Sequence, residues 1–350
     1  MNKSLPITIR KNNFFINNVW IERGERERFE RVSPGHGVVV SSVILCGSAD
    51  VDLAVSAARQ AFESAWAETP GATRGRILIK AAQGIRDRLD EMAYWETLET
   101  GKPISQAKAE IDAAADHYEA AAGMARMVSG ETHNTYGEGM IGLVTKQPIG
   151  VVGLITPWNF PFIVLAERLP FILAAGCTVV LKPSEMTSTT SLIFADILNG
   201  SGLPKGVYNV VTGSGPVVGE AMSKHLDIDM ISFTGSTAVG ERVLEASKSN
   251  LKKVGLELGG KNPQVVFADA NLDDAVDGVA FGLCFNAGQC CVSGSRLIIE
   301  ASIADEFKAK LIKKLSKVKI GDPLDPDTQM GAIVTPQHFN KILDYIEKGQ

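Results

Sequence analysis

The sequence predicts an α/β protein built around a parallel β-sheet. From residue 149 onward, short apolar, β-branched runs alternate with segments that have helical spacing. The composition agrees, because 45% hydrophobic and 21% charged residues are typical of a globular chain. At about 100–200 residues per domain, a chain of 350 residues allows two or three domains and a sizeable core.

Charge, cysteine content and hydropathy exclude several classes of protein. The net charge is −5, whereas a nucleic-acid-binding protein usually has a basic surplus. The five cysteines have no disulfide-like spacing, and residues 1–13 contain no apolar signal core, so we expect a reduced, cytoplasmic protein. Residues 149–166 carry no charge, but Pro157 and Pro161 would break a membrane-spanning helix. We therefore expect neither a membrane nor a nucleic acid as partner.

The individual elements follow from periodicity and turn signals. Residues 1–47 have the pattern of short strands, and a helix with Ser48 as a possible N-cap begins near Val51. Residues 130–146 are rich in glycine and predict a β-hairpin. The other predicted helices are 76–98, 105–127, 164–175, 188–201, 216–225, 237–249, 272–286 and 303–317, and the main predicted strands are 150–156, 178–182, 207–212, 229–234, 253–257 and 264–267.

The loops that follow the parallel strands are where a ligand is expected, because such sheets bind ligands at the carboxyl ends of their strands. The first loop carries Asn159 between two prolines. Its carboxamide suits either an oxyanion-stabilising donor or a helix N-cap. The second loop carries Lys182 and Glu185, which are either ligands for ribose hydroxyls or a surface ion pair.

Two glycine-rich turns, at residues 213–219 and 233–240, follow successive strands. Free backbone N–H groups at a helix start suit a phosphate. Neither turn has the spacing of the usual dinucleotide fingerprint, and neither carries a Walker A lysine. Each turn alone is more typical of a tight connection, but two in succession favour a nucleotide site.

Two further loops offer a base and a nucleophile. Glu257 ends an apolar strand, where burial would raise its pKa and suit a general base, unless it pairs with Lys261. Cys290 and Cys291 are adjacent, so at most one should be a nucleophile, and the alternative for either is a small buried side chain. The five histidines are scattered without metal-ligand spacing, so we expect no metal site.

Together these loops resemble the NAD(P)-dependent aldehyde dehydrogenase superfamily, from about residue 14 to the last residue. Residues 256–261 are similar to the family's glutamate signature, and residues 288–296 are similar to its cysteine signature. The separation between Glu257 and Cys291, 291 − 257 = 34 residues, also matches the family. The resemblance implies that Cys291 is the nucleophile, since it is the second residue after the Gly-Gln pair, and that Cys290 is a bystander.

The resemblance implies oxidation of an aldehyde to a free carboxylic acid, because the CoA-acylating branch lacks the glutamate. Cys291 would attack the aldehyde, the Asn159 amide and the Cys291 backbone N–H would stabilise the oxyanion, and Glu257 would activate the hydrolytic water. Lys182 and Glu185 resemble the residues that bind the adenine ribose, and a carboxylate there favours NAD over NADP as cofactor. The remaining cofactor contacts that the resemblance implies are Thr156, Trp158, Gly215, Pro216, Gly235, Ser236, Gly240 and Leu258.

The resemblance also implies three parts: a Rossmann-like NAD-binding domain over 1–129 and 149–257, an oligomerisation hairpin over 130–148, and an α/β catalytic domain over 258–350. Family members are longer, so we expect this chain to be C-terminally truncated within the catalytic domain and its own turnover to be in doubt. The full-length protein is expected to form a homodimer or homotetramer. Nucleotide binding without turnover and acyl transfer without hydride transfer stay open as alternatives, and the sequence does not identify the aldehyde.

Overall fold

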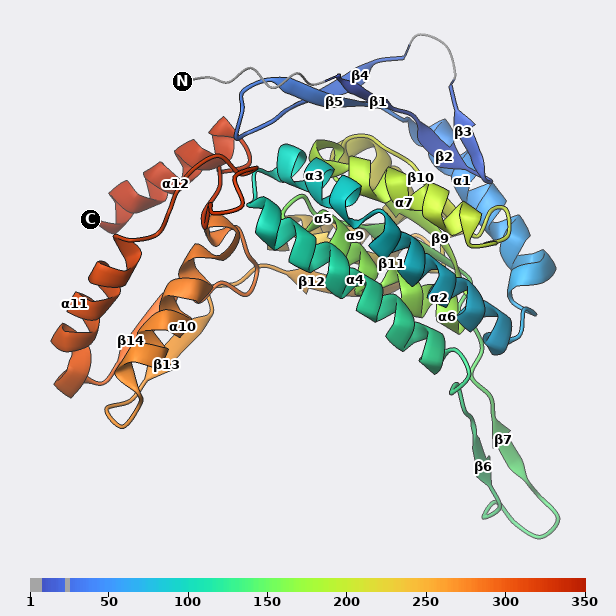
Figure 1. Cartoon of the computed structure of the whole chain (residues 1–350). Helices are drawn as coiled ribbons and strands as arrows, with labels where there is room; N and C mark the ends of the chain where they lie inside the picture. The colour runs from blue at the N-terminus through green and yellow to red at the C-terminus, as the bar shows by residue number, and fades with distance from the viewer. Residues whose placement is uncertain (1–7, 23–25) are drawn as a thin grey trace.

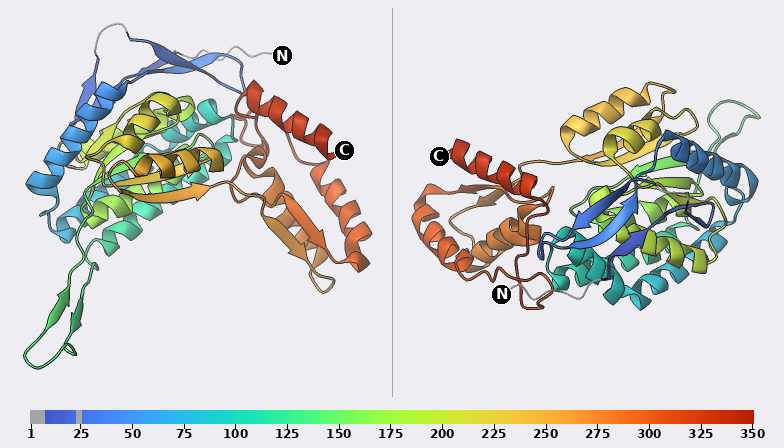
Figure 2. Two further views of the ribbon diagram at one scale, coloured as in Figure 1. Left: turned by 180° about the vertical axis from the view of Figure 1, so that it is seen from behind. Right: turned by 90° about the horizontal axis from the view of Figure 1, so that it is seen from above.

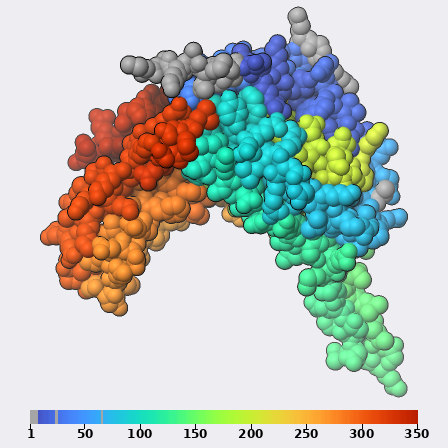
Figure 3. Space-filling view, in the orientation of Figure 1, coloured from blue at the N-terminus to red at the C-terminus, as the bar shows by residue number. Residues whose placement is uncertain are grey.

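The computed structural model of the chain describes residues 8–22 and 26–350, which together form an arch (Figure 1). A large lobe surrounds the central sheet, and the segment after residue 260 forms a smaller lobe at one end of the arch. The space between the smaller lobe and the hairpin is open in the space-filling view (Figure 3). The predicted α/β class is confirmed by this alternation of strands and helices.

The central sheet has seven strands within the described part of the chain, in the order β12-β11-β8-β9-β10-β2-β3. Strands β8 to β12 pair in parallel, and β2 and β3 add an antiparallel edge. The bounds are β2 (Phe14–Ile16), β3 (Val19–Ile21), β8 (Val151–Ile155), β9 (Thr178–Lys182), β10 (Tyr208–Val210), β11 (Met230–Gly235) and β12 (Lys253–Leu258).

Helices cover both faces of this sheet (Figure 2). Along β9, Val179 and Leu181 belong to one hydrophobic core and Val180 to the other, as the two-residue period of a strand requires. The first core packs under α2, α4, α6 and α7, and the second under α1 and α8. The helices of this lobe are α1 (Ser48–Ala61), α2 (Gly71–Asp87), α3 (Leu89–Thr100), α4 (Ile104–Met124), α5 (Pro161–Ala166), α6 (Leu169–Ala175), α7 (Thr189–Gly200), α8 (Glu220–Lys224) and α9 (Thr237–Ser247).

Several predicted helices are interrupted or shifted. The segment 76–98 forms two helices, α2 and α3, because Arg88 leaves the helical conformation at φ −112° and ψ 18°. The segment 164–175 likewise divides into α5 and α6 at Arg168, where Pro170 suits the first turn of a new helix. The segment 216–225 begins as a wide π-helical turn (Gly215–Gly219) before α8. Apolar periodicity continues across such breaks, which is why it did not reveal them.

The predicted N-cap of the first helix is wrong by one residue. Gly47 is the N-cap of α1, and Ser48 is the first helical residue. The Asp50 carboxylate accepts a hydrogen bond from the Gly47 backbone N–H at 2.9 Å, which satisfies a donor at the helix start. Arg26 pairs with the same carboxylate at 2.7 Å.

The smaller lobe contains the parallel pair β13–β14 covered by α10 and α11. Its core consists of Val266, Val276, Val279 and Phe307. The elements are β13 (Pro263–Val266), α10 (Leu272–Cys284), a 3₁₀ turn (Phe285–Gly288), β14 (Arg296–Ile299), a 3₁₀ turn (Ala301–Ile303), α11 (Ala304–Leu315) and α12 (Pro336–Gly349).

Residues 320–335, which we call the return segment, run from α11 back to the large lobe. The Ala332 backbone N–H donates to the carbonyl of Gly101 at 3.0 Å. The buried Arg31 guanidinium donates to the carbonyls of Glu99 at 2.8 Å and Val334 at 2.9 Å. Burial lowers the pKa of Arg31 to about 10. The return segment is therefore joined both to Arg31 of β4 (Arg28–Val32) and to the end of α3.

The segment 130–148 contains an antiparallel hairpin, β6 (Glu131–His133) with β7 (Gly142–Val144), which projects away from the large lobe (Figure 1). Its apolar side chains are exposed, including Ile141 at 72% and Leu143 at 73%. The remaining small sheet joins β1 (Arg10–Asn12), β4 (Arg28–Val32) and β5 (Val39–Ile44), and short helical turns lie at Phe62–Trp66 and Glu185–Thr187. Across the residues that the structure describes, no helix combines the length and apolarity needed to cross a membrane.

Candidate active site

The loops predicted to carry chemistry meet at one edge of the central sheet. Ile155 at the end of β8 pairs with Lys182 at the end of β9, and Thr234 near the end of β11 pairs with Glu257 near the end of β12. Neighbouring parallel strands thus end together, so the loops that follow them share this edge. The Asn159 loop, after β8, has the Lys182 loop and the turn at 213–219 on one side, and the turn at 233–240 with Glu257 beyond it on the other.

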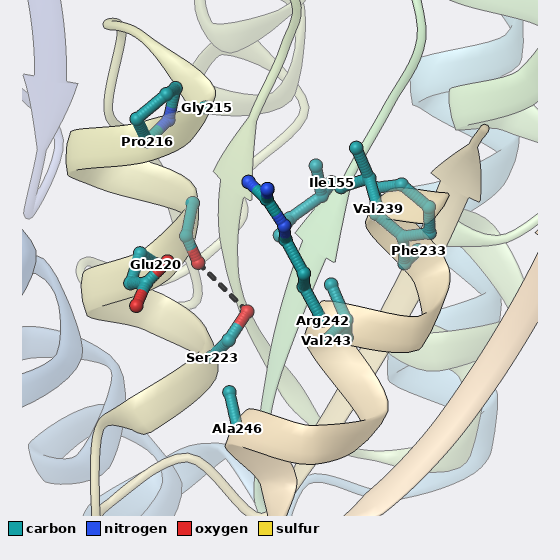
Figure 4. Close-up of a pocket in the computed structure, with 11 residues that line it drawn as sticks. Ile155, Gly215, Pro216, Glu220, Ser223, Phe233, Val239, Arg242, Val243 and Ala246 are labelled. Atoms are coloured by element: carbon teal, nitrogen blue, oxygen red, sulfur yellow. Dashed lines mark hydrogen bonds between the residues drawn. The ribbon is translucent and has the colours of Figure 1, made fainter. Parts of the chain in front are cut away.

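A pocket of about 130 Å³ lies between α9 and α8 with its preceding π-helical turn (Figure 4). The predicted Gly215 and Pro216 line it. Ile155, Phe233 and Val239 are among its apolar walls. An apolar slot of this kind with a few polar groups at its rim suits a flat heterocycle such as adenine.

Sequence reasoning missed most of the pocket lining. Val239, Arg242, Val243 and Ala246 all face the pocket from α9. Counted from Val239, these residues stand at positions 0, 3, 4 and 7, which is the spacing of side chains on one face of a helix. This pattern was visible in the sequence. The Arg242 side chain extends into the space between α9 and α8 (Figure 4), where its charge faces Glu220.

The other predicted turn residues support the pocket but do not line it. A Cβ atom on Gly240 would lie 2.7 Å from Cδ2 of Leu258, so a larger residue there would displace the Leu258 side chain where α9 packs on β12. Ser236 is the N-cap of α9, and its carbonyl accepts from the Gly240 N–H at 2.9 Å. The first N–H groups of a helix have no intrahelical acceptor, so this end of α9, next to Gly235, suits a phosphate group.

Lys182 and Glu185 are held next to each other at the end of β9. The Lys182 Nζ lies 3.4 Å from Oε2 of Glu185 and donates to the Pro183 carbonyl at 3.1 Å. Burial lowers the pKa of the Lys182 ammonium, and the neighbouring carboxylate of Glu185 opposes that shift. The surface ion pair considered above is therefore wrong for Lys182, whose side chain is only 4% exposed.

Thr156 and Trp158 occupy the loop between β8 and α5. Thr156 is buried, and its Oγ1 has no hydrogen-bond partner in the described part of the chain. Ordered water or a ligand can supply a partner for such a hydroxyl, and several other buried hydroxyls of the described residues also lack one. The Trp158 ring meets the His338 ring of α12 edge-on, with 5.3 Å between centroids. Trp158 thus connects this loop to the smaller lobe.

The two adjacent cysteines differ in exposure. Cys291 is exposed, whereas Cys290 is half-buried. Burial raises the pKa of the Cys290 thiol, and its neighbour Cys291 adds to that shift. The Asn262 amide donates to the Cys291 carbonyl at 2.8 Å and fixes this peptide. Cys291 is therefore the more accessible thiol of the pair, and Cys290 is held in its protonated form.

The Asn159 side chain reaches the cysteine loop. Its Nδ2 donates to the Gln289 carbonyl at 2.9 Å, and Asn286 Nδ2 donates to the Asn159 carbonyl at 3.0 Å. The alternative role of Asn159 as a helix cap is wrong, because Phe160 is the N-cap of α5. A carboxamide nitrogen carries two N–H groups, so one can serve a ligand while the other holds Gln289.

Glu257 differs from its predicted surroundings. Its side chain is 66% exposed, so the expected burial is wrong. The reason is its position on β12, the outermost strand of the sheet on this side. Pairing with Lys261 is also wrong, since Lys261 donates to the Gly260 carbonyl and Glu257 instead lies 3.7 Å from Arg168. Among the described residues no hydrogen bond or ion pair joins Glu257 to Cys291.

The turn that precedes the cysteines has an unusual backbone. Asn286, Ala287 and Gly288 all have positive φ, at 50°, 54° and 74°. The left-handed conformation costs about 1–2 kcal/mol for a residue other than glycine, and Ala287 has no polar side chain to offset that cost. Gln289 closes the turn, with its backbone N–H donating to the Asn286 carbonyl at 3.0 Å and its Oε1 accepting from Val334 N–H at 2.9 Å. Periodicity carries no signal for such a turn.

The described residues contain no cluster of metal-ligating side chains. Across residues 8–22 and 26–350, His, Cys, Asp and Glu side chains form no group of three or more that could hold a metal ion.

Comparison with known proteins places this chain in a family. The family described as "Aldehyde dehydrogenase family" matches residues 20–350. Aldehyde dehydrogenase family 2 member C4 of Arabidopsis thaliana is 41% identical over 345 residues, which are 98% of this chain and 69% of the plant protein. Betaine aldehyde dehydrogenase of Bacillus subtilis is 38% identical over 96% of this chain and 69% of its own length.

Solved structures agree with the sequence comparison. An NAD-dependent aldehyde dehydrogenase from Sinorhizobium meliloti superposes with a TM-score of 0.97 at 45% identity, covering 99% of this chain and 70% of that protein. PnpE in complex with nicotinamide adenine dinucleotide superposes with a TM-score of 0.93 at 41% identity, covering 96% of this chain and 69% of PnpE. The predicted combination of a Rossmann-like sheet and a second α/β part is thus confirmed. The chain belongs to the aldehyde dehydrogenase family and is an oxidoreductase of that family.

Proposed function

We propose that the chain oxidises an aldehyde to a carboxylic acid with NAD as hydride acceptor, through a covalent intermediate on Cys291. The observation that carries the proposal is the junction of two loops: the Asn159 amide donates to the Gln289 carbonyl, two residues before the exposed Cys291. A thiol and an amide donor on adjoining loops are the groups that covalent attack on a carbonyl requires.

The residues divide the chemical work as follows. The Cys291 thiolate adds to the carbonyl carbon, and the oxygen becomes an oxyanion that accepts hydrogen bonds from the Asn159 amide and the Cys291 backbone N–H. Collapse of this thiohemiacetal with loss of hydride leaves a thioester on Sγ. Glu257 then takes a proton from water, the hydroxide adds to the thioester carbon, and the C–S bond breaks to release the acid and the thiolate.

Glu257 begins this sequence away from the thiol. Its carboxylate is exposed and lies 3.7 Å from the Arg168 guanidinium. We propose that the side chain turns from Arg168 toward the thioester when hydrolysis begins. Exposure leaves it free to reorient, since no packed neighbour fixes its rotamer.

Several features of the structure support the binding of a dinucleotide. The pocket between α8 and α9 would take the adenine ring, Lys182 and Glu185 the adjacent ribose, and the start of α9 at Ser236 a phosphate. The unpartnered Oγ1 of Thr156 lies further along the same edge of the sheet. When bound, NAD supplies the hydride acceptor.

The first experiment is NADH absorbance from the purified 350-residue chain with a panel of aldehydes. Aldehyde-dependent NADH formation would support the proposal for this chain as it stands. NAD binding measured by calorimetry, without NADH from any aldehyde, would instead favour nucleotide binding without turnover. Acyl transfer independent of NAD would favour the third possibility, an acyltransferase using the same thiol.

Substitution of Asn159 by alanine is expected to lower kcat by about 10²–10³-fold, because the oxyanion loses a fixed donor. The carbonyl of Gln289 loses a partner as well, but it still accepts from Asn286 at 3.2 Å. The measurement is NADH formation under saturating substrate. The exposed Asn199, near the C-terminal end of α7, accepts from the Asn18 amide through its side-chain oxygen and supplies the control substitution Asn199→Ala. Equal activity of the two variants would contradict the assigned role of Asn159.

Removal of the Glu185 charge is expected to relax the preference for NAD over NADP. A carboxylate beside the ribose repels a 2′-phosphate, and Glu185→Gln keeps the size while removing the charge. We expect the ratio of kcat/KM for NADP to that for NAD to rise by about tenfold, equivalent to about 1.4 kcal/mol. An unchanged ratio would show that the 2′-phosphate does not meet Glu185.

We further propose the domain division that the family resemblance implies. Residues 1–129 and 149–257 would bind the cofactor, and residues 258–350 would carry the nucleophile. The hairpin over 130–148 would join subunits into a homodimer or homotetramer. The exposed Ile141 and Leu143 support the role of the hairpin, because contiguous exposed apolar side chains mark interaction surfaces.

A further inference from the structure

The strained turn before the proposed nucleophile is held by contacts from a helix of the large lobe. The Asn286 backbone N–H donates to Oε1 of Gln106, on α4, at 3.3 Å. The Asn286 side chain donates to the carbonyls of Asn159 at 3.0 Å and Gln289 at 3.2 Å. Gln106 is thus the residue of α4 that fixes where the left-handed backbone begins.

Gln106 is itself oriented by a buried charged cluster. Its Nε2 donates to Oε1 of Glu110 at 2.7 Å, one helical turn along α4. The other oxygen of Glu110 accepts from the Lys102 ammonium, which also donates to Oε1 of Glu96 at 3.1 Å. The Lys102 side chain is completely buried. The orientation of Gln106 therefore depends on an ammonium that has no contact with solvent.

The same ammonium reaches the other loop of the site through an aromatic ring. The Lys102 Nζ lies 4.6 Å from the centroid of the Phe160 ring, and Phe160 directly follows Asn159 in the chain. Phe160 stacks on Phe285, the residue before Asn286, with 5.7 Å between ring centroids and 21° between planes. One buried charge thus contacts both loops: through Glu110 and Gln106 it reaches the turn, and through Phe160 it reaches Asn159.

Stability alone is a poor explanation for this cluster. Burying a charged group is costly, and well-packed apolar side chains of similar size often serve stability as well or better. Here two carboxylates share one ammonium, and burial raises the pKa of Glu96 to about 8. Oε2 of Glu96 has no hydrogen-bond partner among the residues described. Such a cluster instead provides hydrogen bonds and ion pairs of fixed direction, which an apolar core does not provide.

We propose that Gln106, Glu110 and Lys102 are positioning residues that hold the Asn286–Gln289 turn, and with it Cys291, in the geometry in which the thiol reacts. The inference rests on the proposed function, in which Cys291 is the nucleophile. It adds that the reactivity of this exposed thiol is set partly by a buried cluster on α3, α4 and the connection between them.

The test compares Gln106→Met with Gln83→Met. Gln83 donates to Asp87 at 2.8 Å across one turn of α2, the same spacing as Gln106 and Glu110, but it is exposed and far along the chain from the site. We expect Gln106→Met to lower kcat about tenfold, because the turn loses a partly buried hydrogen bond that positions it, with KM for NAD changed by less than about twofold. We expect Gln83→Met to behave as the unmodified chain.

A second readout does not need turnover. Alkylation of Cys291 by iodoacetamide, followed over a range of pH by tandem mass spectrometry to separate it from Cys290, should be slower in Gln106→Met by a similar factor. In Glu110→Gln one end of the new amide must present N–H groups to Gln106 or to the Lys102 ammonium, so this variant should also slow alkylation of Cys291 by a similar factor. Gln83→Met should be alkylated at the unmodified rate, and a purely structural role would not produce this difference at an equal folded fraction.

The contrary results are equally specific. Unchanged kcat and an unchanged alkylation profile in Gln106→Met would overturn the inference, as would losses that match only a reduced folded fraction in urea titration. Should Gln106→Met fold poorly, Gln106→Asn shortens the side chain by one methylene and applies the same criteria. If Cys291→Ala still turned over, the proposed function would fail, whereas the alkylation comparison would still report on positioning.

Discussion

Replacement of Cys291 by alanine is expected to abolish aldehyde-dependent NADH formation, with turnover lowered by at least about 10⁴-fold. The sulfur atom forms the bond to the substrate carbon, so no other group in the site can take over its step. Alanine removes only the exposed Sγ, and the carbonyl of residue 291 keeps its hydrogen bond from Asn262. The measurement is NADH absorbance with saturating aldehyde and NAD, together with urea unfolding to show an intact fold.

The adjacent cysteine provides the matched control. Cys290 is half-buried, and burial raises the pKa of its thiol, so Cys290→Ala should leave turnover within about threefold of the unmodified chain. Loss of activity in Cys290→Ala with retention in Cys291→Ala would reverse the assignment of the nucleophile. Retention of activity in both variants would remove covalent catalysis by either thiol.

Replacement of Glu257 by glutamine is expected to lower steady-state turnover by about 10²–10⁴-fold and to leave the first turnover intact. Glutamine cannot accept the proton of the attacking water, so the thioester on Cys291 should accumulate. Rapid mixing should therefore show a burst of about one NADH per active thiol, followed by near-arrest. Hydroxylamine, which attacks thioesters without a general base, should restore part of the steady rate.

Glu167→Gln is the control for Glu257. Glu167 also pairs with Arg168, at 3.1 Å, and is similarly exposed, but it lies at the end of α5 and not at the end of a strand. It should retain the steady rate and show no burst. Absence of a burst in Glu257→Gln, with no NADH at all, would place the glutamate before hydride loss and contradict its role in hydrolysis.

Much of the fold was predictable because parallel sheets leave a local signal. Buried strands such as Thr178–Lys182 are continuous apolar runs, and the loops after them are the known positions for ligands. The helix breaks at Arg88 and Arg168 were not predictable, because the apolar positions on either side continue at helical spacing. Tertiary packing, not local preference, decides where such helices divide.

The candidate site was predicted only in part. Asn159 and Glu257 were singled out because each lies at or after the end of a strand, and Cys291 was chosen over Cys290 on the resemblance to the family. The exposure of Glu257 was not foreseen, since an apolar strand does not reveal whether it lies at the edge of its sheet. Lys102 and Gln106 were missed because their contacts to the site join residues far apart in sequence; Gln106 and Asn286 are 180 positions apart. Only a structure brings such pairs together.

The return segment has a consequence for the order in which the molecule is completed. The Gln289 side-chain oxygen accepts a hydrogen bond from the Val334 backbone N–H. The Val334 carbonyl in turn accepts a hydrogen bond from Arg31, which is 303 positions away in the chain. During synthesis the large lobe can form its hydrophobic core before residue 334 leaves the ribosome, because domains tend to fold from the N-terminus as they emerge. The turn beside Cys291 acquires its Val334 partner only afterwards. A nascent chain can therefore hold a formed sheet while the reactive loop still lacks a contact that fixes Gln289.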